Sequence, residues 1–121
     1  MVKKVSEITF EDIANYLRLT EINSEDISDL ETYLEVAINY IENYTGIPRT
    51  AEESESLDDF SDFIIVVYVL CQDMYDNRCM YVDSKELNNT VKTILDMHTR
   101  NNIWEMQEII IKKYWYSLYK K

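Results

Sequence analysis

Residues 60–75 read FSDFIIVVYVLCQDMY, and this stretch decides whether the chain is entirely helical. Its centre, residues 63–70, is rich in the β-branched and aromatic residues that favour strands. A strand needs turn residues at both ends, however, and none occurs before Arg78. Apolar residues instead keep helical spacing across the stretch, at Phe60, Phe63, Ile64, Val67, Cys71, Met74 and Tyr75. The spacing predicts one helix from Leu57 to Arg78, apolar nearly all round at its middle and therefore central to the core.

The single glycine and the single proline of the chain, Gly46 and Pro48, mark the end of a long second helix. We expect this helix to begin at a cap on Asn23 or Ser24. Its main apolar face carries Ile27, Leu30, Leu34, Ala37, Ile38 and Ile41. A second apolar strip beside it carries Tyr33, Val36, Tyr40 and Tyr44, and the opposite face carries Glu31, Glu35, Asn39 and Glu42. The apolar arc is wider than one partner helix usually covers.

Cap residues predict the shorter helices. Thr9, followed by two acids, begins a helix that carries Ile13, Tyr16 and Leu17. A polar loop from Arg49 to Ser56 separates the second helix from the third. Asp83 or Ser84 then begins a fourth helix with Leu87, Val91, Ile94, Leu95 and His98. A fifth, aromatic helix runs from Ile103 towards the end. We therefore expect an all-α fold, a compact bundle of four to five helices, with residues 1–100 as the main domain and residues 101–121 as a C-terminal aromatic helix.

Composition excludes several functional classes. The chain has 121 residues, and one glycine is too few for a phosphate loop, a dinucleotide fingerprint or a nucleophile elbow. The longest apolar run, Phe63 to Cys71, is too short to span a membrane, and the start has no apolar signal core, so we expect folding in the cytoplasm. The net charge is −11, and residues 1–62 hold sixteen acids against four bases. This excess disfavours DNA binding, and a solvated surface is enough to explain it.

The candidate chemical groups favour structural roles. His98 is the only histidine; it has no supporting spacing for catalysis with Asp96 or Cys79, and a position near a helix end explains it. Two cysteines are too few for a metal motif, and we expect Cys71 to lie in the core. The acids Glu52, Glu53, Glu55, Asp58, Asp59 and Asp62 lack the glycine and the alternation of a calcium loop, so we expect a solvated loop.

Two arginines and the last helix are the candidates for contacts with other chains. Arg78 and Arg100 each close a predicted helix, where a cation interacts favourably with the helix dipole. A bidentate contact to an acid of a neighbouring subunit is an equally good explanation. In the last helix Trp104, Trp115, Tyr116 and Tyr119 point to different sides, which favours a surface that docks a partner.

Four segments resemble the head–tail connector (adaptor) proteins of tailed bacteriophages and prophages. They are Ile8-Thr9-Phe10-Glu11-Asp12-Ile13-Ala14-Asn15-Tyr16-Leu17-Arg18, Ala37-Ile38-Asn39-Tyr40-Ile41-Glu42-Asn43-Tyr44-Thr45-Gly46, Met74-Tyr75-Asp76-Asn77-Arg78 and Ile94-Leu95-Asp96-Met97-His98-Thr99-Arg100. The likeness covers roughly residues 8–100, and the order and spacing of the segments carry it. Two features depart from the family: the loop from Arg49 to Ser56 lacks a proline, and the tail after Arg100 is aromatic and carries Lys112, Lys113, Lys120 and Lys121.

The resemblance implies a helical protomer of a ring, dodecameric on the portal, in the virion neck. Such a ring extends the DNA channel, binds the portal and docks the next neck or tail protein; it needs no catalytic residue, cofactor, metal or membrane. Under this interpretation the protomer contacts involve Tyr33, Tyr40, Tyr75, Arg78 and Arg100. The tail would reach the portal or an adjacent protomer. The main alternative is a free-standing acidic helical module that binds a host protein, such as a DNA mimic; an enzyme is disfavoured.

Overall fold

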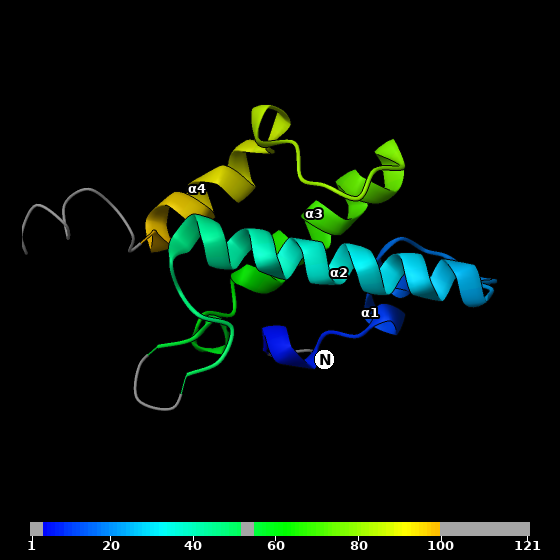
Figure 1. Ribbon diagram of the computed structural model, residues 1–121, viewed down its shortest axis with the longest axis horizontal. Helices are drawn as coiled ribbons and strands as arrows, with labels where there is room; N and C mark the ends of the chain where they lie inside the picture. Colours follow the sequence, from blue (N-terminus) through cyan, green and yellow to red (C-terminus); the bar gives the residue numbers. More distant parts are fainter. Residues whose placement is uncertain (1–3, 52–54, 100–121) are drawn as a thin grey trace, which may run out of the picture.

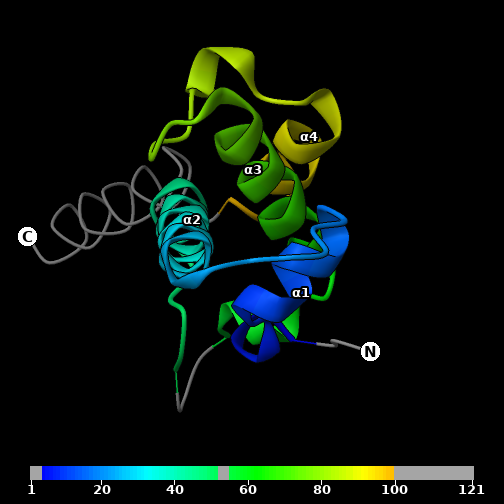
Figure 2. The same cartoon turned by 90° about the vertical axis from the view of Figure 1, so that its right-hand side faces the viewer.

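The computed structural model describes residues 4–51 and 55–99, which fold into four α-helices and three short 3₁₀ turns and contain no strand. The helices are α1 (Phe10–Tyr16), α2 (Ser24–Thr45), α3 (Phe63–Asn77) and α4 (Asn89–His98). The 3₁₀ turns are η1 (Val5–Glu7), η2 (Leu57–Asp59) and η3 (Ser84–Glu86). Figure 1 shows α2 running the length of the molecule, and the turned view in Figure 2 shows α3 and α4 on one side of it. The all-α prediction is confirmed for the described residues, and the predicted fifth helix lies outside them.

Local caps fix both ends of α2. The Asn23 side chain accepts a hydrogen bond from the Asp26 backbone N–H at 2.9 Å, and Asp26 accepts one from the Asn23 N–H at 3.1 Å. This reciprocal capping box satisfies N–H groups that have no partner within the helix. At the other end Gly46 is left-handed, with φ 76°, and its N–H donates to the Glu42 carbonyl at 2.9 Å. A residue without a side chain adopts this conformation at little cost, so the helix ends there.

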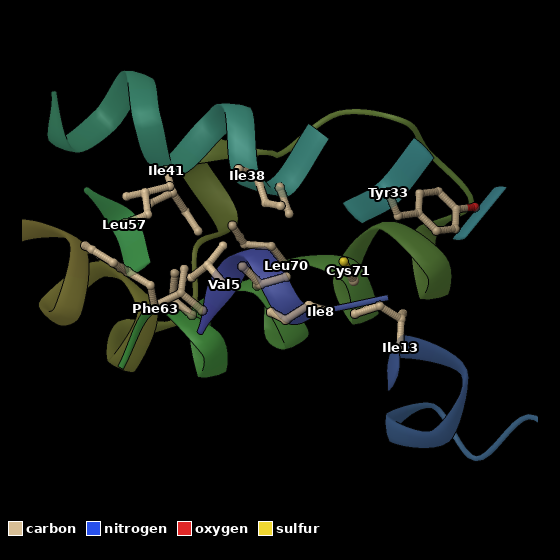
Figure 3. Packing of buried hydrophobic residues seen from close by; sticks show 14 of the residues in the cluster. Val5, Ile8, Ile13, Tyr33, Ile38, Ile41, Leu57, Phe63, Leu70 and Cys71 are labelled. Carbon is tan, nitrogen blue, oxygen red and sulfur yellow. The ribbon is translucent and has the colours of Figure 1, made fainter. Parts of the chain in front are cut away.

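The third helix is the centre of the fold. It packs against α1, α2, α4 and η1, and Figure 2 looks along α2 and shows α3 beside it. Six of its residues are buried: Phe63, Val66, Val67, Leu70, Cys71 and Met74. Figure 3 shows side chains of α3 meeting those of η1, α1, α2 and η2 in one cluster. The predictions that this stretch forms a helix and that the helix is central to the core are therefore confirmed.

Two predicted helix starts are wrong, and both for the same reason. The predicted third helix began at Leu57, but η2 occupies residues 57–59 and Phe60 is extended. The Ser56 N–H donates to the Asp59 carboxylate at 2.8 Å, so this cap serves an isolated turn. Likewise Asp83 caps only η3, and α4 begins after Asn88, whose side chain accepts from the Thr90 N–H at 2.8 Å. A cap residue starts a turn, and tertiary packing decides whether a helix follows.

Candidate interaction surface

Helices α1 and α3 both end in an arginine with left-handed backbone. Arg18 has φ 60° and Arg78 has φ 53°, and apart from these two no described residue other than Gly46 has positive φ. In α3 the Cys79 N–H donates to the Met74 carbonyl and the Arg78 N–H donates to the Tyr75 carbonyl. Glycine is the usual residue at this position of such a helix end, because a Cβ atom crowds the backbone there. In α1 and α3 an exposed arginine takes this place instead.

The two helix ends meet at one end of the molecule. Leu19, which follows Arg18, lines a notch of about 10 Å³ together with Tyr33, Tyr75 and Arg78. The Arg78 guanidinium carbon lies 4.4 Å from the centre of the Tyr75 ring, which is a cation–π contact. We call Leu19, Tyr33, Tyr75 and Arg78 the arginine corner. Three of the predicted interface residues, Tyr33, Tyr75 and Arg78, are therefore brought together.

Tyr33 was expected to contact a neighbouring copy, but the structure buries it within its own chain. Its side chain is only 3% exposed and belongs to the core of its own protomer, at the edge of the cluster in Figure 3. Burial raises the pKa of its hydroxyl, and the nearby Asp29 carboxylate raises it further. Because Tyr33 is covered by its own chain, it supports Tyr75 and Arg78 from within and offers no surface of its own.

The remaining predicted contact residues do not lie at the corner. Tyr40 is half-buried on α2, where its ring centre lies 5.9 Å from that of Tyr44. The Tyr44 hydroxyl donates to the Asp96 carboxylate of α4, and this hydrogen bond, with burial, raises the pKa of Tyr44 to about 12. Tyr40 therefore packs on Tyr44 and against the core of its own protomer. Arg100, Trp104, Trp115, Tyr116 and Tyr119 lie outside the described residues.

Five large apolar side chains remain at least 42% exposed on the described surface: Tyr16, Ile65, Met80, Tyr81 and Met97. Tyr16 stacks on Tyr68, with ring centres 5.0 Å apart, and its hydroxyl donates to the Gln72 side chain at 3.1 Å. Met80 and Tyr81 follow Arg78 in the chain after one residue, Cys79. Apolar surface next to an exposed arginine is a composition that protein interfaces favour.

Arg49 is an important residue that the sequence did not single out. Its guanidinium donates to Glu35 at 2.9 Å, to Glu42 at 3.1 Å and to Asn39 at 2.7 Å. Its backbone N–H also donates to Glu42 at 3.0 Å. These hydrogen bonds raise the pKa of Arg49, the contact with Glu35 most of all. The sequence does contain a signal for these contacts. The turn at Gly46 reverses the chain, so Arg49, the next basic residue, returns to the acidic face of α2.

Two of the acids expected in a solvated loop, Asp58 in η2 and Asp62 just before α3, hold other segments in place. Asp58 accepts a hydrogen bond from the Ser6 N–H at 2.8 Å and thereby ties η1 to η2. Asp62 lies 2.8 Å from His98 Nε2, and the His98 ring packs on Phe60 and Phe63 with ring centres 4.5 and 4.8 Å apart. His98 therefore joins the end of α4 to the start of α3. Within residues 4–51 and 55–99 no three metal-ligating side chains come together.

Comparison with other proteins identifies no relative. No protein-family model, no curated protein and no solved structure matches the chain. Among the described residues, no helix combines the length and the apolar character that a transmembrane span requires.

Proposed function

We propose that the protein is a structural head–tail connector of a tailed phage or prophage, in which copies form a ring beneath the portal. The observation that carries the proposal is the arginine corner. The Met74-Tyr75-Asp76-Asn77-Arg78 segment, one of the four that resemble the connector family, ends α3 in an exposed left-handed arginine stacked on Tyr75. Another of the four segments ends in Arg18 after α1, and the next residue, Leu19, lines the same notch as Arg78.

The charges of the chain support a contact between copies at this corner. An arginine fork matches the geometry of a carboxylate, and the described residues expose many more acids than bases. A closed ring requires two different complementary patches on each subunit. The corner, with Met80 and Tyr81 beside it, would be one patch, and an acidic face of the next copy would be the other.

The proposed ring, dodecameric on the portal, would sit in the virion neck and bind the portal on one side and the next neck or tail protein on the other. DNA would pass through it without specific binding. A net charge of −11 suits such a channel, because a negative wall does not hold the phosphate backbone. The proposed activity needs no catalytic residue, no cofactor and no membrane.

The acidic-module alternative is weakened by Arg49. A protein that mimics DNA needs a continuous row of negative charge on its surface. On α2 the polar face would be the best candidate for such a row, yet Arg49 binds both Glu35 and Glu42 on it. The local charge is therefore partly neutralised where the mimic would need it.

Sedimentation of the protein with its portal tests the proposal. We expect the wild-type protein to move with the portal through a density gradient, because the portal presents many copies of one weak contact at a high effective concentration. In a parallel experiment the protein is mixed with a basic DNA-binding protein of the host, which is the partner that a DNA mimic would bind. Binding to that protein, displaced by DNA, with none to the portal would contradict the connector and favour the mimic.

A further inference from the structure

A groove with a volume of about 530 Å³ opens between the second half of α3 and the chain that leads to α4. This connecting chain, which includes η3, bows away from α3 in Figure 1. On the α3 side the groove is lined by Leu70 and Met74, and on the other side by Val82 and Leu87. Tyr81, 64% exposed, also lines it. The groove therefore has an apolar floor and an exposed aromatic ring.

The polar lining of the groove is negative. Asp73, Asp83 and Glu86 line it, and among the residues that the structure describes no lysine, arginine or histidine does. Burial raises the pKa of the Asp73 carboxyl, and the neighbouring Asp76 raises it further, so a cation near Asp73 would relieve an unfavourable local charge. An apolar floor with carboxylates around it suits a segment that combines aromatic rings with lysines, whose long stems cover apolar surface.

The chain itself contains one segment of this composition. Residues 112–121, KKYWYSLYKK, hold four lysines, four aromatic residues and no acid. No stretch of ten residues within 1–99 holds more than two basic residues. Residues 1–99 carry 21 acids and seven bases, a charge of −14, whereas residues 100–121 carry two acids and five bases, a charge of +3. The two parts of the chain are therefore complementary in charge.

We propose that the groove lined by Leu70, Asp73, Met74, Tyr81 and Glu86, here called the acidic groove, binds residues 112–121 of a neighbouring copy. This inference rests on the proposed ring and names one of its contacts. A ring needs a donor surface and a different acceptor surface on each subunit, and this pair of segments supplies both. Each copy then gives its tail to one neighbour and receives the tail of the other.

The length of the chain permits this contact. The described residues end at Thr99, beyond the end of α4, whereas the groove lies near the start of α4. Residues 100–111 connect Thr99 to the basic segment, and twelve extended residues span roughly 40 Å. That span exceeds the length of α4, about 15 Å for its ten residues. A connection of this length permits the segment to contact a neighbouring copy.

Cysteine cross-linking in the full-length protein tests the proposal, because Cys79 lines the groove. The acceptor is the wild-type chain, and the donor carries Ser117→Cys in the tail together with Cys79→Ser. Cys71 is fully buried, and burial raises its pKa to about 12, so it does not compete in either chain. On mild oxidation of an equal mixture, with and without portal, we expect a mixed dimer linked through residues 79 and 117, identified by mass spectrometry of the linked peptides.

Matched variants show whether the link depends on the groove. An acceptor with Asp73→Asn and Glu86→Gln should form about fivefold less mixed dimer, since each removed charge weakens the contact modestly. An acceptor with Glu25→Gln and Glu31→Gln, two exposed acids of α2 outside the groove, has the same charge and should link as the wild type does. An acceptor with Cys79→Ser and Ser28→Cys, which moves the thiol to α2, should not link.

Two results would overturn the inference. One is the absence of the mixed dimer both with and without portal. The other concerns a third variant, Ser117→Cys with Cys79 retained: a disulfide within single chains of this variant, without any mixed dimer, would mean that the tail covers its own groove. Either result, with the wild-type protein still sedimenting with the portal, would reject the tail contact and leave the connector proposal standing. A mixed dimer without portal binding would reject the connector instead.

Discussion

Replacing Phe63 by alanine is expected to lower the free energy of unfolding by about 3–5 kcal/mol. Phe63 is 0% exposed and begins α3, where its ring meets Phe60 at 5.7 Å and His98 at 4.8 Å between ring centres. Removing the ring leaves a cavity where α3, α4 and η2 join, and it also removes the surface on which His98 packs. Because a domain of this size is stabilised by only about 5–15 kcal/mol, the loss is a large fraction of the total.

Urea unfolding followed by circular dichroism measures this effect. The control is Ile65→Ala on the same helix, two residues away, where the side chain is 53% exposed. That variant should lose no more than about 1 kcal/mol, because little apolar area returns to water. Equal losses for the two variants would mean that α3 does not turn its Phe63 face to the core, and would contradict the packing described above.

The second large effect is a loss of assembly in Arg78→Gly without a loss of stability. Glycine relieves the crowding at φ 53°, and this relief offsets the removal of the cation–π interaction with Tyr75. We therefore expect the free energy of unfolding to stay within about 1 kcal/mol of the wild-type value. Binding to the portal should nevertheless fall at least about tenfold, which is the effect of removing an interface arginine worth about 1.4 kcal/mol or more.

Sedimentation with portal and urea unfolding, performed on the same samples, separate the two roles of this arginine. Lys92→Ala removes one exposed base from α4, away from the arginine corner, and should bind the portal as the wild type does. If Arg78→Gly bound the portal normally, the arginine would serve only to end α3. If it lost most of its helical signal, the role of Arg78 would be structural within the protomer.

The sequence predicted those parts of the fold that local chemistry determines. The ends of α2 follow from nearby residues alone. Asn23 and Asp26 accept hydrogen bonds from backbone N–H groups at its start, and Gly46 ends it. The starts of α3 and α4 were wrong because Ser56 and Asp83 cap isolated turns, and only packing shows where the helix resumes. The apolar spacing of residues 60–75 was decisive, since it marked a helix where composition favoured a strand.

The candidate surface was predictable only in part. Arg78 was found from its place at a predicted helix end and Tyr75 from the resemblance, but the left-handed conformation of Arg78 is visible only in three dimensions. Tyr33 was placed in the second apolar strip of α2 and expected to contact a neighbour. Helical spacing does not show how much of a helix face the neighbouring helix covers. The acidic groove joins residues of α3 to the chain around η3, and the sequence contains no signal that these two segments enclose a space.

Electron microscopy of the matching portal mixed with the protein tests the central claim most directly. The portal alone is the reference, and the reconstruction is compared with and without the added protein. The connector account predicts a continuous ring of additional helical density beneath the portal, coaxial with the DNA channel, in which adjacent copies touch through the arginine corner. A portal without added density, at protein concentrations well above those of the portal, would contradict it.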